Sequence, residues 1–133
     1  MQRFVVNPET IAPPAGNYSH SVRIQMPGAA WVFVAGQVSI EPSGEFVGEG
    51  DLRRQTEQVF QNLQAVLEAN GATFGDVVQI HTYVTTMDGV AEMREVRQRY
   101  LPTPPPASTL VQVSALFRPD ALIEVDAVAV VGT

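Results

Sequence analysis

The sequence has 133 residues, enough for one hydrophobic core but not for two, so we expect a single domain over residues 1–133. Apolar residues make up 45% and charged residues only 17%, which predicts that some apolar surface contacts another subunit. The net charge of -6 without a Lys/Arg cluster argues against nucleic-acid binding, and the lack of cysteine excludes disulfides, thiol nucleophiles and Cys-based metal sites.

The first 17 residues are rich in Pro, Ala, Gly and Asn, and we expect them to form an extended arm. They lack the apolar run of a signal peptide, and no other segment is apolar enough to span a bilayer, so the expected location is cytoplasmic, with no membrane partner. Alternating apolar residues then predict strands at 19–26 and 30–39, joined by a turn at Pro27-Gly28. A further turn follows, with room for a short strand at 45–47.

The hydrophobic period changes to that of a helix from Asp51 onward. Asp51 is suited to cap the start of this helix, and Asn70-Gly71 its end. A strand at 77–85 follows, and its alternation means that one side faces a core. Its expected faces are Val78, Ile80, Thr82 and Val84 on one side, and Gln79, His81, Tyr83 and Thr85 on the other.

A second helix is predicted at 89–100, with Asp88 as a cap, and the proline-rich run after Leu101 must end it. Two strands at 109–116 and 122–131 complete the chain. The order β-β-(β)-α-β-α-β-β predicts an α/β chain of the α+β type, a two-layer sandwich with both helices on one face of a mixed sheet. The other sheet face then needs a partner.

Two carboxylates stand in the apolar last strand. Glu124 and Asp126 are two residues apart, so they share one face at a spacing of about 7 Å along the strand. Such a pair is suited to general acid–base chemistry. The alternative is that both side chains face water or pair with arginine.

Other polar residues are weaker candidates. Tyr18 and His20 share a face and could each donate a hydrogen bond to a ligand, although a lone histidine near a strand end is more often exposed or structural. His81 lies on the polar side of its strand and is assigned no role. Gly36 interrupts a strongly apolar strand, which predicts a bulge or the close approach of another group to the backbone.

Four segments, VAGQV at 34–38, GATFGDVV at 71–78, PASTLVQV at 106–113 and IEVDAVA at 123–129, resemble in order and spacing the Rid superfamily, the reactive intermediate deaminases also called YjgF or endoribonuclease L-PSP proteins. The resemblance covers nearly the whole chain. It implies a chorismate-mutase-like fold of the bacillus type and a homotrimer whose sheets form a central barrel.

The resemblance also implies a site and a reaction. In deaminating members, clefts between subunits bind enamine or imine acids such as 2-aminoacrylate. An arginine binds the carboxylate, and a glutamate on the last strand orients the attacking water. The products are a 2-keto acid and ammonia, and no metal or organic cofactor takes part. Glu124 matches the catalytic glutamate, and Tyr18 matches an aromatic residue near the N-terminus. The expected site comprises Tyr18, Ala35, Gly36, Ser108, Leu110 and Glu124 of one chain, with Arg94 contributed by its neighbour.

The sequence departs from the family pattern at the arginine. The family's Pro-Ala-Arg-Ser stands here as Pro106-Ala107-Ser108-Thr109, and Ala35 stands where serine is usual. One hydroxyl cannot replace a charged, bidentate contact. Either the substrate lacks the carboxylate or another cation binds it. Arg94 is the first candidate and Arg118 the second, unless Arg94 simply pairs with a glutamate on its helix.

These inferences predict a homotrimeric hydrolytic deaminase of enamine or imine intermediates whose substrate preference is altered by Ser108. The alternative is a non-catalytic protein on the same trimer that binds a small molecule or regulates. A ribonuclease or translation inhibitor, a third label within this family, is disfavoured by the acidic charge balance.

Overall fold

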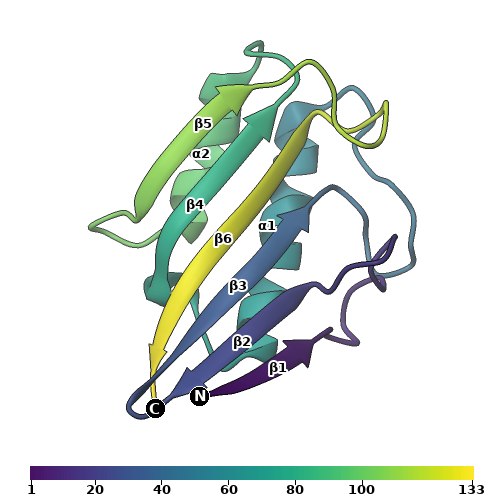
Figure 1. Ribbon diagram of the computed structural model, residues 1–133. Coiled ribbons are helices and arrows are strands. Elements are labelled where there is room, and N and C mark those ends of the chain that lie inside the picture. Colours follow the sequence, from purple (N-terminus) through teal and green to yellow (C-terminus); the bar gives the residue numbers. More distant parts are fainter.

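A computed structural model describes residues 1–133 and shows one six-stranded sheet with both helices on the same face (Figure 1). This confirms the predicted two-layer α+β architecture. Neither helix has the length and apolar character needed to cross a membrane. The elements in chain order are β1 (Gln2–Val6), β2 (Ser21–Met26), β3 (Ala29–Gln37), α1 (Leu52–Ala69), the 3-10 turn η1 (Phe74–Asp76), β4 (Val77–Val84), α2 (Val90–Tyr100), β5 (Ala107–Gln112) and β6 (Ile123–Gly132).

The strand order is β1-β2-β3-β6-β4-β5, so the C-terminal strand lies in the middle of the sheet (Figure 1). Every neighbouring pair is antiparallel except β4 and β5, which are parallel and are connected through α2. Along β6, Ile123, Val125, Ala127 and Ala129 alternate toward the helices and are buried. The residues between them, Glu124 and Asp126 included, therefore face the other side of the sheet.

The helix α1 covers the centre of the sheet. Asp51 caps it as predicted, because a side-chain oxygen of Asp51 accepts a hydrogen bond from the backbone N–H of Arg54 at 3.0 Å. Its apolar stripe is fully buried, and each such side chain contributes about 1.5 to 3 kcal/mol relative to exposure. The stripe comprises Val59, Phe60, Leu63, Val66 and Leu67.

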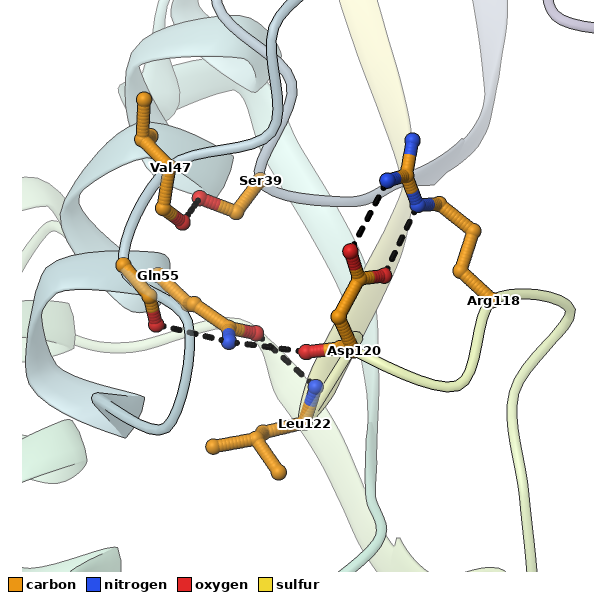
Figure 2. Close-up of polar contacts among 7 residues, drawn as sticks. Ser39, Val47, Gln55, Arg118, Asp120 and Leu122 are labelled. Carbon is orange, nitrogen blue, oxygen red and sulfur yellow. Dashed lines mark hydrogen bonds and ion pairs between the residues drawn. The ribbon is translucent and has the colours of Figure 1, made fainter.

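A buried glutamine joins α1 to the segment that leads into β6. Gln55 donates from Nε2 to the backbone oxygens of Gly48, at 2.9 Å, and Asp120, at 3.0 Å (Figure 2). Its Oε1 accepts from the backbone N–H of Leu122 at 2.8 Å. Because Leu122 immediately precedes β6, these contacts fix the start of the strand that carries Glu124.

The face opposite the helices is uncovered in the protomer. Trp31 and Phe33 of β3 stack there with ring centroids 6.3 Å apart and remain 45% and 43% exposed. Val111 of β5 extends this open face and is 41% exposed. The chain therefore leaves an apolar sheet face without a partner, as the sequence predicted.

Two predictions about strands were wrong. Residues 2–6 are not part of an extended arm but form β1, which pairs with β2, because the short run Phe4-Val5-Val6 favours a strand before Pro8. Residues 45–47 form no strand. There, a single bridge joins Ile40 to Phe46, and the Ser39 hydroxyl donates to the Val47 carbonyl at 2.7 Å (Figure 2).

Three further expectations need correction. Val78 is 47% exposed because the β4–β6 register shifts between Val77 and Gln79, and Val77 is buried in its place. Asp88 does not cap α2. The N-cap residue is Gly89. Its φ of 82° is favourable for glycine, and no side chain caps the helix with a hydrogen bond. The strand predicted at 109–116 lies instead at Ala107–Gln112.

Candidate functional site

Glu124 is the second residue of β6 and lies on the open face, between the buried neighbours Ile123 and Val125. Its side chain is half-buried. Tyr83 lies directly opposite it on β4. The carboxylate thus sits on a regular strand anchored in the core, which limits how far it can move.

A β-bulge in β3 makes room for this carboxylate. Val34 pairs with Ala127 and Gln37 with Val125, so β3 carries one extra residue at this point. A Cβ atom on Gly36 would lie 2.6 Å from Oε2 of Glu124 and 2.7 Å from its Cδ. Only glycine leaves space for the Glu124 side chain against the backbone. Both the bulge and the close approach that the sequence suggested are present.

The Glu124 carboxylate opens into a pocket of about 480 Å³. Four of the predicted site residues line it: Tyr18, Ala35, Gly36 and Glu124. Ala15, Gly16 and Phe117 complete its walls, and Phe117 is 62% exposed. Glu124 is the only acidic or basic residue in the lining, so the protomer presents one carboxyl group in a largely apolar pocket.

His20 fixes the segment that carries Tyr18. The imidazole is buried; its Nδ1 accepts from the side-chain amide of Gln37 at 3.1 Å and its Nε2 donates to the Ala12 carbonyl at 2.8 Å. This tautomer follows because an amide NH₂ group can only donate. The backbone N–H of His20 donates to Asn7 at 2.8 Å. His20 is therefore structural and holds one wall of the pocket against β3.

The surroundings of Glu124 favour its protonated form. Burial, and after it the negative charge of Asp126, raise the pKa of Glu124 above its ordinary value. A carboxyl group of this kind can take up a proton and release it again closer to neutral pH than an exposed glutamate, as general acid–base catalysis requires.

Asp126 forms a hydrogen bond with His81, a residue to which the sequence analysis assigned no role. Its Oδ1 accepts a hydrogen bond from Nδ1 of His81 at 2.7 Å. Burial, followed by the nearby charge of Asp126, raises the pKa of Tyr83. Neither Glu124 nor Asp126 pairs with an arginine. The sequence marked His81 only as polar, and its pairing depends on the register between β4 and β6.

Ser108 and Leu110 lie away from this pocket in the same chain. On β5 they are opposite Ile80 and Thr82, whose side chains are buried on the helix-facing side of the sheet. Leu110 packs against the core. Glu124 faces the other side, so Ser108 and Leu110 do not line the pocket around Glu124 within one chain. Ser108 and Leu110 can reach such a pocket only on another copy of the chain.

The two candidate cations behave differently. Arg118 forms a two-pronged ion pair with Asp120, at 2.8 Å and 2.9 Å (Figure 2). Its guanidinium carbon also lies 4.6 Å from the ring centroid of Phe46. The hydrogen bond to Asp120 raises the pKa of Arg118. Arg94 is exposed on α2 and forms no ion pair, so the alternative of pairing with a helix glutamate is not observed. Arg94 therefore remains free to bind an anion.

A second arginine on α2 went unnoticed in the sequence. Nη1 of Arg97 is buried and has no hydrogen-bond partner. Burial, followed by the charge of Arg94, lowers the pKa of Arg97. Its position four residues after the buried Met93 was the available signal, because that spacing turns a side chain toward the protein.

Comparisons with known proteins agree with this fold. The family model described as Endoribonuclease L-PSP matches residues 9–131. A RutC family protein of Pyrococcus abyssi is 36% identical over 129 residues, 97% of this chain and 98% of the relative. A 2-iminobutanoate/2-iminopropanoate deaminase of Dermatophagoides farinae is 28% identical over 131 residues, 98% and 97% of the two chains. The crystal structure of RidA from a Psychrobacter species superposes with a TM-score of 0.85 at 27% identity, covering 96% of this chain and 99% of that one.

Proposed function

Because the chain belongs to the endoribonuclease L-PSP family, the Rid superfamily, we propose that it is a homotrimeric hydrolytic deaminase of reactive enamines and imines. The observation that carries this proposal is the carboxylate of Glu124, held against Gly36 at the end of an apolar pocket. The deaminase name of the Dermatophagoides relative supports the same reaction class.

Glu124 would act on water. In the charged form it accepts a proton as water attacks the carbon of the protonated imine, which forms a C–O bond and gives a neutral carbinolamine. It then returns that proton to the nitrogen, the C–N bond breaks while the hydroxyl proton passes to Glu124, and a carbonyl compound and ammonia leave. An enamine first takes a proton on carbon to become the protonated imine. The raised pKa of Glu124, caused by burial and by Asp126, suits a group that must both take and give a proton near neutral pH.

The proposed trimer would complete the site. Closed three-fold symmetry covers the open face of each copy, including Trp31 and Phe33, with the faces of two others. It also offers the β5 edge of a neighbour, with Ser108 and Leu110, to the pocket around Glu124. The expected mass is about 43 kDa, three times 14.4 kDa. A stable monomer at micromolar concentration in sedimentation would contradict this assembly.

A substrate carboxylate would need a cationic partner in this site. Ser108 supplies one neutral hydroxyl, whereas Arg94 of the neighbour is exposed and free of ion pairs. We assign substrate anchoring to Arg94. The substrate preference is then expected to differ from that of family members with the Pro-Ala-Arg-Ser pattern.

Turnover of freshly generated amino-acid imines tests the proposal. Glu124→Gln should abolish activity while the trimer remains. Ser108→Arg should raise kcat/KM on 2-aminoacrylate-derived imines by about one to two orders of magnitude, because a charged bidentate contact is worth about 1.5 to 3 kcal/mol. Gln61→Arg, which adds the same charge on an exposed position of α1, serves as the control.

Two outcomes would contradict parts of this reading. A wild-type protein already fully active on 2-aminoacrylate would show that Ser108 is no handicap. A folded, trimeric Ser108→Arg variant that neither turns over imines nor binds a 2-keto acid would overturn catalysis by Glu124, and the non-catalytic binding protein would become the better description.

A further inference from the structure

A row of polar side chains continues from Glu124 along the open face. Tyr83 is opposite Glu124, and His81 is opposite Asp126, in the register between β4 and β6. The shortest contact of the row is the hydrogen bond of 2.7 Å from His81 Nδ1 to Asp126 Oδ1. Since residues two apart on a strand share a face, Asp126 is the nearest charged neighbour of Glu124 along β6.

His81 is the only member of this row that can carry a positive charge. On β5 it is opposite Thr109, which is uncharged, and on β4 the ring of Tyr83 lies 6.5 Å away. Around Glu124, the bulge of β3 contributes Gly36 and the N-terminal segment contributes Tyr18. Arg118, in the loop before β6, is already paired with Asp120. No other cation of the protomer forms an ion pair with either of the two carboxylates.

We propose that His81 and Asp126 form a positioning pair that governs when Glu124 carries its charge and can act on water. The proposal rests on the catalytic role proposed for Glu124. With His81 cationic, the pair has no net charge, and Glu124 ionises easily. With His81 neutral, the negative charge of Asp126 is uncompensated, and Glu124 retains its proton to higher pH.

The direction of each effect follows from this arrangement. Histidine side chains are generally cationic in the acidic range where carboxyl groups titrate. Loss of the imidazole should therefore make Glu124 harder to ionise, and loss of the Asp126 charge should make it easier. Glu124 and Asp126 are about 7 Å apart along β6, so in a partly solvated site Asp126→Asn should move the titration of Glu124 by about 0.5 to 1 pH unit. His81 lies opposite Asp126 on the neighbouring strand and is farther from Glu124, so the loss of its charge should have a smaller effect.

The first test is the pH profile of kcat/KM on a freshly generated imine. Asp126→Asn should move its acidic limb to lower pH and His81→Gln to higher pH. The amide introduced by His81→Gln carries no charge but keeps a hydrogen-bond donor at this position. Thr109→Val, next to His81 on β5, is the control and should leave the limb in place. Sedimentation confirms that every variant assembles as the wild type does.

The second test does not depend on activity. In protein labelled with ¹³C at glutamate side chains, the signal of Glu124 is assigned by its loss in Glu124→Gln, and its titration is followed directly by NMR. Opposite shifts in Asp126→Asn and His81→Gln would support the pair even if no imine is hydrolysed, in which case only the proposed reaction fails. An unchanged Glu124 titration in both variants would overturn the pair.

Discussion

Replacing Gly36 by alanine tests directly whether the position of the Glu124 carboxylate matters. The new Cβ would lie 2.6 Å from Oε2, 2.7 Å from Cδ and 2.9 Å from Cγ of Glu124. Gly36 is not among the glycines with positive φ, so alanine can adopt its backbone conformation. The substitution therefore acts on the side chain of Glu124 and not on the course of β3.

The size of the effect follows from these distances. Ordinary contact begins near 3.4 Å, so the carboxylate must withdraw by about 0.8 Å from its 2.6 Å position. Displacing a catalytic group by about 1 Å can cost about 100-fold in rate. We expect kcat/KM to fall by about 10- to 100-fold. The atoms that must move are the end of a half-buried side chain, so the free energy of unfolding should fall by only about 1 kcal/mol.

The assay compares Gly36→Ala with Gly132→Ala in imine hydrolysis and in urea-induced unfolding. Gly132 is exposed at the end of β6, away from the pocket, and a Cβ there would meet no atom within 4 Å. Gly132→Ala should therefore keep wild-type turnover. Full activity of a folded, trimeric Gly36→Ala protein would refute the reasoning, since Glu124 would then be displaced without consequence.

Three further predictions concern stability. Burial and the charge of Asp126 raise the pKa of Glu124, so ionisation of this residue lowers the free energy of unfolding as pH rises through the carboxyl range. At about pH 7, Glu124→Gln should therefore unfold at a higher urea concentration than the wild type. This gain should vanish near pH 3, where the wild-type carboxyl group is protonated. The ion pair with Arg118 lowers the pKa of Asp120, so its stabilisation is present at neutral pH and is lost as pH falls through that pKa; Asp120→Asn should cost about 1 kcal/mol at neutral pH and nothing in acid. Gln55→Met should cost about 3 kcal/mol in chemical unfolding because it leaves three backbone groups without partners, whereas Gln61→Ala on the exposed side of α1 should be nearly neutral; equal losses would contradict this.

The predictable parts of the fold were those with strong local patterns. The stripe of α1 and its Asp51 cap are read directly from spacing, and the structure confirms them. Glu124 stood out as a carboxylate in an apolar strand, and Gly36 as a break in another. In contrast, β1 was missed, because its short apolar run Phe4-Val5-Val6 precedes a segment rich in proline and alanine, and five residues form a stable strand only when they pair with β2.

The register between strands, and with it the sheet face of each residue, could not be predicted from the sequence. Ser108 was assigned to the pocket because its neighbours in sequence resemble a family motif, yet its side of the sheet depends on pairing with Ile80. A strand places adjacent residues on opposite faces, so pattern alone does not say which of Ser108 and Thr109 faces the helices. The contact of His81 with Asp126 joins residues 45 positions apart, and only the β4–β6 register brings them together.

The extra residue in β3 also makes the number of residues in this strand informative. Between Val34 and Gln37 there are two residues, opposite the single residue Asp126 on β6. Deleting one of these two residues would remove the bulge and give a regular strand. The β3–β6 pairs before and after this point would then stay as they are. The sheet would survive, but the space beside the backbone that accommodates Glu124 would close. Among related sequences, the number of residues at this point should therefore indicate whether a glutamate at position 124 has room for its carboxylate, independently of the residue types around it.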